Sequence, residues 1–301
     1  YPVTMLFYEV TGLNRLSFSL VALIQLPLLL WVLYKLGVPK RFANVSVRNL
    51  LAYSLLLMLA FFVSMPSKEF ITFLFIAWIP WLLLKKKLRL KYTLLLIFSG
   101  LLFFGIWYRP YYVLIPIIAG VIYLTSLINF KRKVLTGIFS GLLVVIFLSL
   151  SYGVVKGEFL SQSTREALNE ERLGEEATNS AIRSPLKTDT WYGETFGVLY
   201  GFVSVNVPVN GLKHVLQPQI IAFVFWQLVL SVYLLFLFKN CLAKRKKYRY
   251  ELWGFYLVFA YFIIQGVFEP DLGSAVKHKI GILPLIYFVL YYDSFRKNIP
   301  V

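Results

Sequence analysis

The chain alternates between apolar runs and short polar stretches that carry charge. Apolar runs of about 15–21 residues, each bounded by charged residues, predict helices that cross a bilayer. The pattern predicts nine such segments, at Leu16–Tyr34, Leu50–Val63, Phe70–Leu84, Tyr92–Trp107, Tyr111–Phe130, Val134–Gly153, Ile220–Phe238, Leu252–Phe268 and Ile280–Tyr292. We therefore expect an all-α fold, a polytopic transmembrane helical bundle that forms a single integral membrane domain over residues 1–301, with one large loop at 154–219.

The composition supports this class and excludes others. Hydrophobic residues make up 59% of the 301 residues and charged residues only 15%, which is not typical of a soluble domain. The single Cys241 excludes a disulfide within the chain, and His214 and His278 lack a zinc-ligand spacing. Because the chain begins at Tyr1 without a signal peptide, we expect an odd number of helices upstream of it.

The distribution of basic residues predicts the orientation in the membrane. Alternate turns hold 20 of the 31 Lys and Arg, and Glu251 and Asp293 are the only acids among them. These bases are Lys35, Lys40, Arg41, Arg48, Lys85, Lys86, Lys87, Arg89, Lys91, Lys131, Arg132, Lys133, Lys239, Lys244, Arg245, Lys246, Lys247, Arg249, Arg296 and Lys297. We expect that face to be cytoplasmic and to bind anionic membrane lipids, not nucleic acid. Loop 154–219 is then extracytoplasmic.

The stretch Gly266–Pro284 concentrates reactive side chains on the outer face. Glu269 is followed by the cluster Lys277-His278-Lys279 just before the sequence becomes apolar again. Charge at a membrane boundary is costly enough to indicate a site, although a polar turn whose lysines reach lipid phosphates explains it equally well. His278 can serve as a base near neutral pH. Glu269 is the alternative base, or else the partner of a nearby basic residue.

Two further outer turns carry candidate residues. Arg109 lies between two apolar helices, where it must face water, a phosphate headgroup or an acid, and its guanidinium can hold phosphate oxygens bidentately. Lys68 either supplies a second charge to that phosphate or pairs with its neighbour Glu69. Tyr111 and Tyr112 fit sugar stacking, and they also fit an interfacial aromatic belt.

Loop 154–219 is long enough to indicate a lid or a binding surface. Its sequence Ser163-Thr164-Arg165-Glu166 has the form of a capping box, which predicts a surface helix from Thr164 to about Ala177. We expect that helix to be a solvated lid. Arg183, Lys187 and the aromatic run Trp191–Tyr200 follow it.

These motifs together resemble a known family. They comprise Ser67-Lys68-Glu69, Arg109-Pro110-Tyr111-Tyr112, one large loop between late helices, and Phe268-Glu269-Pro270…Gly273-Ser274-Ala275…Lys277-His278-Lys279…Leu283-Pro284. The set resembles bacterial Wzy-type polysaccharide polymerases, which assemble O-antigen, capsule or exopolysaccharide repeat units and are related in fold to the O-antigen ligases of the GT-C superfamily. Members often carry Arg directly before the motif's His, where this chain has Lys277.

The resemblance implies a glycosyltransferase of the bacterial inner membrane. Its donor is an oligosaccharide on undecaprenyl diphosphate, its acceptor is another lipid-linked repeat unit, and a chain-length regulator protein is an expected partner. No metal or other cofactor is expected, since cations can stabilise the departing diphosphate. The implied roles place Arg109, Lys277, Lys279 and Lys68 on the diphosphate, His278 or Glu269 as the base, and Tyr111, Tyr112 and Arg183 on the glycan.

Three other functions stay open at this point. An O-antigen ligase uses the same donor with a different acceptor, and the sequence does not separate it from a polymerase. A lipid-linked oligosaccharide flippase would need charges deep within its helices, which are nearly free of charge here. A non-catalytic membrane scaffold would explain the basic turns but not the Lys-His-Lys cluster.

Overall fold

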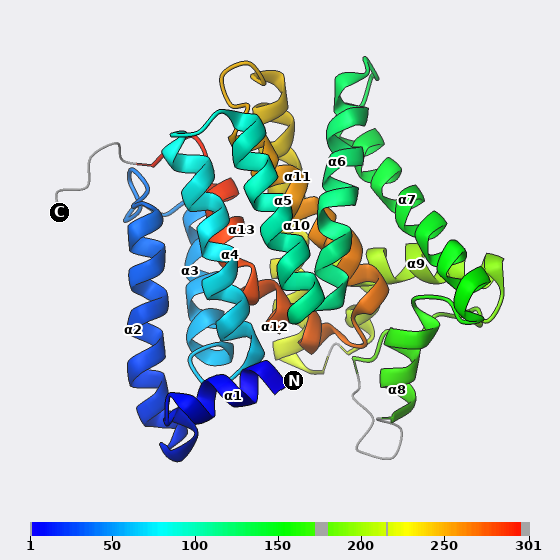
Figure 1. Cartoon of the computed structure of the whole chain (residues 1–301), viewed down its shortest axis with the longest axis horizontal. Coiled ribbons are helices and arrows are strands. Elements are labelled where there is room, and N and C mark those ends of the chain that lie inside the picture. Colours follow the sequence, from blue (N-terminus) through cyan, green and yellow to red (C-terminus); the bar gives the residue numbers. More distant parts are fainter. Residues whose placement is uncertain (1, 172–179, 215, 296–301) are drawn as a thin grey trace. The chain divides into compact units, whose positions relative to one another are not determined.

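The computed structural model describes residues 2–171, 180–214 and 216–295 (Figure 1). This part of the chain is helical, and its only β pairing consists of two isolated bridges, Pro39 with Phe295 and Ala181 with Asp271. Six of the helices are long and apolar enough to cross a membrane. The expected all-α fold is therefore confirmed, and these helices are compatible with a multi-pass membrane protein.

Helices cover all nine predicted segments, but fewer than nine of them could cross a membrane by length and composition. The six that could are α2 (Phe18–Leu36), α5 (Leu90–Trp107), η2 with α6 (Pro110–Val113 and Leu114–Leu127), α7 (Lys133–Lys156), α10 (Pro218–Ala243) and α11 (Glu251–Phe268). The shorter α3 (Val47–Phe62) has 16 residues, and α4 (Lys68–Lys85) carries charge at both ends.

The ninth predicted segment, Ile280–Tyr292, contains α13 (Leu283–Leu290) and only the end of the preceding helix, α12 (Leu272–Gly281). The two helices meet at an angle of 73°, and Pro284 lies in the first turn of α13. If this pair counts as one span, the described residues hold seven candidate spans. The Lys277-His278-Lys279 cluster therefore lies on a helix, and the expectation of a simple polar turn there is wrong.

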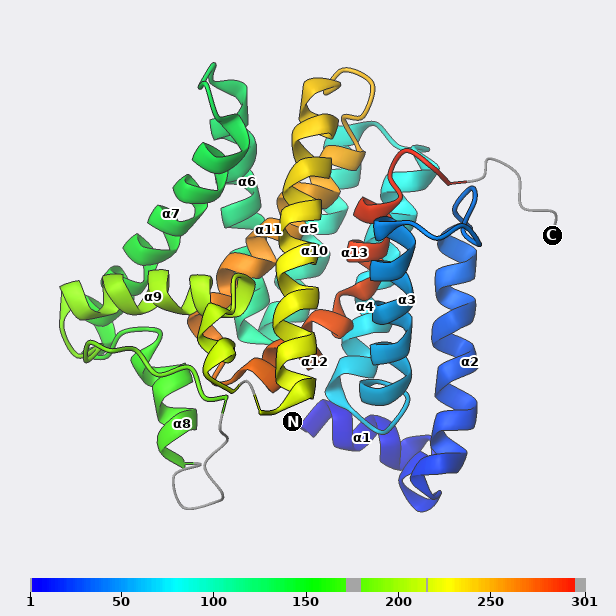
Figure 2. The same ribbon diagram turned by 180° about the vertical axis from the view of Figure 1, so that it is seen from behind.

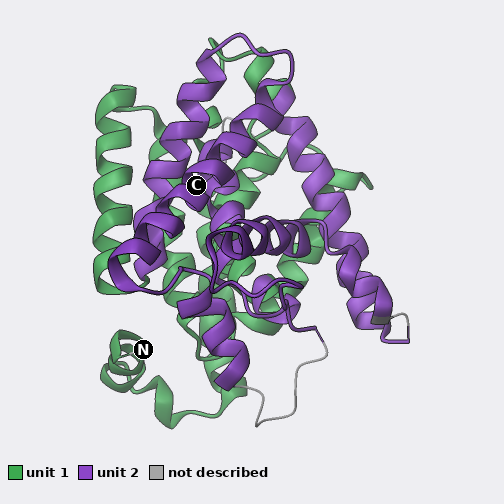
Figure 3. Cartoon of the chain, turned by 90° about the vertical axis from the view of Figure 1, so that its right-hand side faces the viewer, with its two compact units in different colours: residues 1–109, 240–254, 276–301 green, residues 110–239, 255–275 purple. Residues whose placement is uncertain are grey.

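The chain forms two compact units, shown in different colours in Figure 3. Unit 1 comprises Tyr1–Arg109, Asn240–Gly254 and Val276–Val301, and unit 2 comprises Pro110–Lys239 and Phe255–Ala275.

Unit 1 is built around α13, whose eight residues are all buried. Helices α2, α3 and α4 contact α13, and α1 (Pro2–Val10) lies crosswise at one end of α2 to α4 (Figures 1 and 2). The basic turns of this unit meet at the opposite end. There Lys86 pairs with Glu251 at 2.5 Å and Arg48 with Asp293 at 2.9 Å. Glu251 and Asp293, the two acids predicted to lie on the basic face, are thus each paired with a basic residue of that face.

Unit 2 is built around α11, which is buried along nearly its whole length. The ring of Phe238 on α10 stacks on Phe255 and Phe259 of α11. A Cβ atom on Gly141 of α7 would lie 2.7 Å from Ile263 of α11, so glycine lets these two helices approach closely. Helix α9 (Trp191–Asn206) runs crosswise to α10 (Figure 2).

Loop 154–219 is largely helical, which corrects the expectation of a loop with one surface helix. A π-helical turn, η3 (Gln162–Glu166), continues into α8 (Ala167–Glu171), and α9 and η5 (Val209–His214) follow. The predicted capping box is wrong: the Ser163 hydroxyl donates to the Leu160 carbonyl at 3.4 Å, and the backbone N–H of Glu166 donates to Ser161 at 3.0 Å. Residues 172–177 of the predicted helix lie outside the described residues.

The start of this region is fixed in place by a buried arginine, whereas Leu168, Glu170 and Glu171 of α8 are exposed, so the solvated lid stays a prediction. The guanidinium of Arg165 is fully buried and donates to the carbonyls of Gly197 on α9 at 3.1 Å and Gly266 on α11 at 3.0 Å. The carboxylate of Glu194, also buried, accepts hydrogen bonds from the hydroxyls of Ser149 and Ser161. Buried charges with such partners hold η3 and α9 against the rest of unit 2.

Glycine at position 201 is required by this packing, which gives a testable prediction. A Cβ atom there would lie 1.9 Å from the Gly266 carbonyl oxygen and 2.3 Å from the Arg165 guanidinium. We expect Gly201→Ala to lower the free energy of unfolding by about 1–3 kcal/mol, as overpacked cores do. The matched control is Gly120→Ala in α6, where nothing lies within 4 Å. Thermal unfolding of the purified protein in detergent measures both; an equal melting temperature for the two variants would contradict the packing described.

Candidate functional site

The start of α4 places a carboxylate inside unit 1. The hydroxyl of Ser67 accepts a hydrogen bond from the Phe70 backbone N–H at 3.3 Å, so Ser67 is the N-cap that begins the helix. Glu69 then falls in the first turn, where a negative charge interacts favourably with the helix dipole. Its side chain is fully buried.

Two cationic or ionisable side chains from distant parts of the sequence meet this carboxylate. The Arg109 guanidinium lies 2.8 Å from Glu69 Oε1, and the Nε2 atom of His278 lies 3.0 Å from the same oxygen. Only 3% of the Arg109 side chain and 16% of the His278 side chain are exposed. We call these three residues the Glu69 cluster. Among the described residues, no side-chain or backbone group hydrogen-bonds to the second carboxylate oxygen, Oε2.

Backbone contacts hold the cluster in position. Arg109 follows the last turn of α5, where its N–H donates to the Phe104 carbonyl at 3.0 Å. The neighbouring Tyr108 hydroxyl donates to the Lys68 carbonyl at 3.0 Å, which ties the end of α5 to the start of α4. From the sequence, we predict that the turns at Ser67–Glu69 and Trp107–Tyr112 lie on the same face of the membrane. In unit 1 these turns are in contact, through Tyr108 with Lys68 and through Arg109 with Glu69.

The pKa of Glu69 shows how strongly the cluster favours its charge. Burial alone would raise this pKa, but the hydrogen bond with His278 and the charge of Arg109 outweigh burial and lower the pKa to about 2. Because the pKa in the folded protein lies below its ordinary value, the carboxylate stabilises the fold above pH 4.5 and loses this effect as the pH falls toward 2. Glu69 is therefore a carboxylate at neutral pH.

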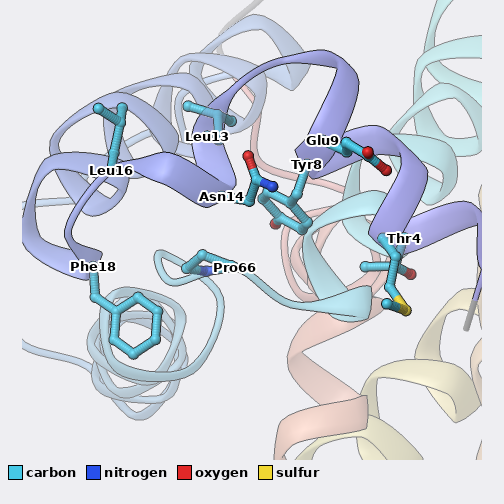
Figure 4. Close-up of a pocket in the computed structure, with 9 residues that line it drawn as sticks. Thr4, Tyr8, Glu9, Leu13, Asn14, Leu16, Phe18 and Pro66 are labelled. Carbon is cyan, nitrogen blue, oxygen red and sulfur yellow. The ribbon is translucent and has the colours of Figure 1, made fainter.

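A cavity of about 350 Å³ adjoins the elements that carry the cluster (Figure 4). Figure 4 shows Tyr8 and Thr4 of α1 on one wall and Pro66 and Phe18 among the apolar residues around it. The hydroxyl of Tyr8 accepts from the Ser67 N–H at 3.0 Å, and the Thr4 hydroxyl lies 2.8 Å from that of Tyr108. The polar wall of the cavity is thus hydrogen-bonded to the turns that carry Glu69 and Arg109.

The lysines that the sequence assigned to one diphosphate do not face the same side. Successive residues of an α-helix are rotated by about 100°, so Lys277 and Lys279 lie on nearly opposite sides of α12. Lys279 is fully buried, whereas Lys277 is partly exposed. Lys68 is also partly exposed, next to Glu69 in the first turn of α4. Lys68 and Lys277 are therefore the lysines of this set that a ligand could reach.

The alternative base, Glu269, lies in unit 2. Its side chain is buried, and its Oε1 atom accepts from the Gln265 amide at 3.0 Å. Asp271, two residues later, caps α12 by accepting from the Ser274 N–H at 2.7 Å and the Ser274 hydroxyl at 2.8 Å. The acids of this stretch thus contribute to the ends of α11 and α12.

The three residues assigned to the glycan differ in their surroundings. Tyr112 is fully buried, with its ring centroid 5.9 Å from that of Tyr261, and it presents no exposed face for a sugar. Tyr111 is half-buried and its ring stacks on Phe268 at 5.4 Å. Arg183 is exposed and lines a pocket of unit 2.

Sequence reasoning did not single out Glu69 as a site residue, because it treated this acid only as a local partner for Lys68. A signal was present, since Glu69 is the only acid between Glu9 and Glu158. An isolated acid beside an apolar segment needs a partner from elsewhere in the chain. Sequence reasoning also did not use the spacing Gly193-x-x-x-Gly197-x-x-x-Gly201. Small residues at this spacing mark close helix contacts, so the spacing could have predicted the tight packing of α9.

No family model matches the sequence, and neither a curated protein nor a solved structure is significantly similar to it. The resemblance to Wzy-type polymerases therefore rests on the quoted residues alone.

The cluster predicts a strong coupling between Glu69 and Arg109. Removing one member of a buried ion pair costs about 3–5 kcal/mol, because it leaves the other charge uncompensated. We expect Glu69→Gln and Arg109→Met each to lower the melting temperature markedly, and the double variant to lose much less than the sum of the two. Thermal unfolding in detergent measures this double-mutant cycle.

The partly exposed pair Arg48–Asp293 provides the control, since Arg48→Met and Asp293→Asn should each cost at most about 1 kcal/mol. Additive losses at Glu69 and Arg109 would show that the two residues do not interact in the folded protein.

Proposed function

We propose that this chain is a glycosyltransferase of the Wzy polymerase type. It transfers a glycan from an undecaprenyl-diphosphate donor to the terminal sugar of another lipid-linked repeat unit, on the outer face of the bacterial inner membrane. The contact between His278 and Glu69 is the observation that supports this proposal most strongly.

That contact favours His278 over Glu269 as the base. A carboxylate that accepts from one ring nitrogen fixes the tautomer of the imidazole and stabilises the imidazolium that forms when the ring takes a proton. With Nε2–H directed to Glu69 at 3.0 Å, the atom of His278 that accepts a proton is Nδ1. The carboxylate of Glu269 is itself buried and hydrogen-bonded to Gln265.

The proposed step balances without a metal. The acceptor hydroxyl oxygen attacks the anomeric carbon of the donor glycan and gives its proton to His278 Nδ1, while the bond from that carbon to the diphosphate oxygen breaks. The electron pair leaves with undecaprenyl diphosphate. Lys68 and Lys277, the lysines of the set that a ligand could reach, stabilise the departing negative charge together with Arg109, whose buried guanidinium must shift from Glu69 to contribute.

The cavity of Figure 4 supports a lipid-linked substrate. Its lining combines Met5, Leu13 and Leu16 with polar groups that are hydrogen-bonded to the turns of the Glu69 cluster. Among the described residues, the one charged side chain of the lining is Glu9, so the recess suits the hydrocarbon chain of such a molecule, with the diphosphate outside it at the cations of the Glu69 cluster. The same geometry also suits the ligase reaction, which shares the donor.

The position of the buried charges favours an enzyme over a flippase. Glu69 is the second residue of α4, Arg109 follows the end of α5, and His278 lies in the last turn of α12. Charges that line a transport path occur within the membrane-spanning segments, whereas Glu69 and Arg109 lie at helix ends; His278 lies near the break of the candidate span formed by α12 and α13.

Substitution of His278 and Arg109 tests the proposal. We expect His278→Gln to keep the fold, because Gln can still donate to Glu69, and to slow transfer by about 10²–10⁴-fold. Arg109→Lys keeps the charge but loses the planar fork, so transfer should slow by roughly tenfold. The readout is polymer length on gels from a deletion strain that carries each variant.

Protein level and melting temperature must be measured on the same variants, because Arg109 is buried and its loss can unfold the chain. Lys156→Gln, an exposed substitution at the end of α7, is the control that should leave polymer length unchanged. Wild-type polymer length from a stable His278→Gln protein would refute its role as the base.

The orientation is tested separately with single cysteines. In a Cys241→Ala background, an impermeant thiol reagent should label Ser180→Cys in intact cells and spare Lys131→Cys. This follows from the excess of basic residues in the turn around Lys131. The reverse labelling would place the Glu69 cluster on the cytoplasmic face, where the proposed donor is not presented.

A further inference from the structure

A second pocket, of about 290 Å³, lies in unit 2 between α8 and the segment 183–187. On one side it is lined by Glu166, Asn169 and Glu170, and on the other by Arg183 and Lys187, with Ser184, Pro185 and Leu186 between them. Its volume is close to the lower limit of about 300 Å³ for small-molecule sites. A ligand of the size of one sugar ring suits it better than a large molecule.

The segment 183–187 is held at both of its ends. Before it, the buried Ile182 donates its N–H to Pro270 at 2.7 Å and accepts from the Asn169 amide at 3.2 Å. After it, the buried Thr188 donates its hydroxyl to the Glu166 carboxylate. The backbone carbonyl of Lys187 also packs so closely on Gly193 that a Cβ atom there would lie 1.8 Å away. Both walls of the pocket are therefore fixed before a ligand binds.

In the described part of the chain, the cations of one wall do not pair with the acids of the other, although Glu166 lies 4.0 Å from the Arg165 guanidinium and accepts from the Thr188 hydroxyl. Among the described residues, neither Arg183 nor Lys187 forms an ion pair with Glu166 or Glu170. The described residues that line the pocket include two carboxylates and two cations, so their charges balance. An anionic ligand would be repelled by one wall and a cationic ligand by the other, so the pocket favours a neutral ligand with both donors and acceptors.

We propose that this pocket binds a neutral sugar ring of the glycan, an inference that rests on the proposed function. Each sugar hydroxyl is both a donor and an acceptor, so neighbouring hydroxyls can donate to Glu170 and accept from Arg183. Hydrogen bonds to charged groups are the stronger kind. Segment 180–182 is also bridged to residues 270–272, where α12 begins.

Direct binding tests this proposal independently of polymer formation. The probe is the free oligosaccharide that mild acid releases from the producing strain's own lipid-linked pool. Its affinity for the full chain in detergent is measured by titration calorimetry. We expect Arg183→Ala and Glu170→Gln each to weaken binding by about tenfold or more, because a site built to hydrogen-bond hydroxyls loses affinity when one partner is removed. The matched controls are Lys156→Ala and Glu158→Gln, which are exposed and outside the pocket.

The outcomes separate the pocket from the proposed reaction. Arg183-dependent binding supports the pocket even if His278→Gln has no effect on polymer length. Equal affinity of all four variants, or no binding by the parent protein, overturns the pocket and leaves the reaction at His278 to be judged by its own assay. Because Arg183 and Glu170 are exposed, their variants should unfold at the parent temperature, and this is checked first.

Discussion

The buried charge of Glu69 is the constraint on which the site depends. A carboxylate taken out of water is unstable unless it is paired and hydrogen-bonded, and Glu69 has no exposed surface. Its partners come from two other parts of the chain, the end of α5 and the end of α12. The ends of these helices must therefore meet the start of α4 for the carboxylate to remain charged. In this way a single acid determines where Arg109 and His278 lie.

The cores of the two units show what a hydropathy pattern can and cannot predict. It correctly placed helices at all nine apolar segments, since each run is long and bounded by charge. It could not show that α11 and α13 are central, because a helix that faces lipid is as apolar as one that faces protein. The most apolar stretch of α10 has a higher mean hydropathy than that of α11, yet far less of it is buried. Pro284 predicts a kink at this point of the chain, since proline interrupts a helix, but the 73° bend of α12 against α13 is not contained in the hydropathy pattern.

Part of the site followed from residue chemistry, and the rest required the fold. Arg109 and His278 stood out because each is a rare ionisable group beside an apolar run, and the structure brings both of them to Glu69. The opposite orientations of Lys277 and Lys279 depend on whether that stretch is a turn or a helix, and the sequence interpretation chose a turn. The burial of Arg165 was missed for a related reason. A capping-box pattern describes local hydrogen bonds, whereas the partners of Arg165 lie 32 and 101 residues away.

The shared oxygen of Glu69 links donor binding to proton transfer in the proposed reaction. Arg109 and His278 both contact Oε1 of Glu69. Because they share this oxygen, the hydrogen bond of each residue to it is weaker than it would be alone. A diphosphate that draws the Arg109 guanidinium toward itself removes one of these two competitors. The carboxylate then interacts more strongly with His278 and stabilises its imidazolium form more. Under the proposed function, donor binding at Arg109 therefore strengthens the contact between Glu69 and His278, the residue that takes the acceptor's proton.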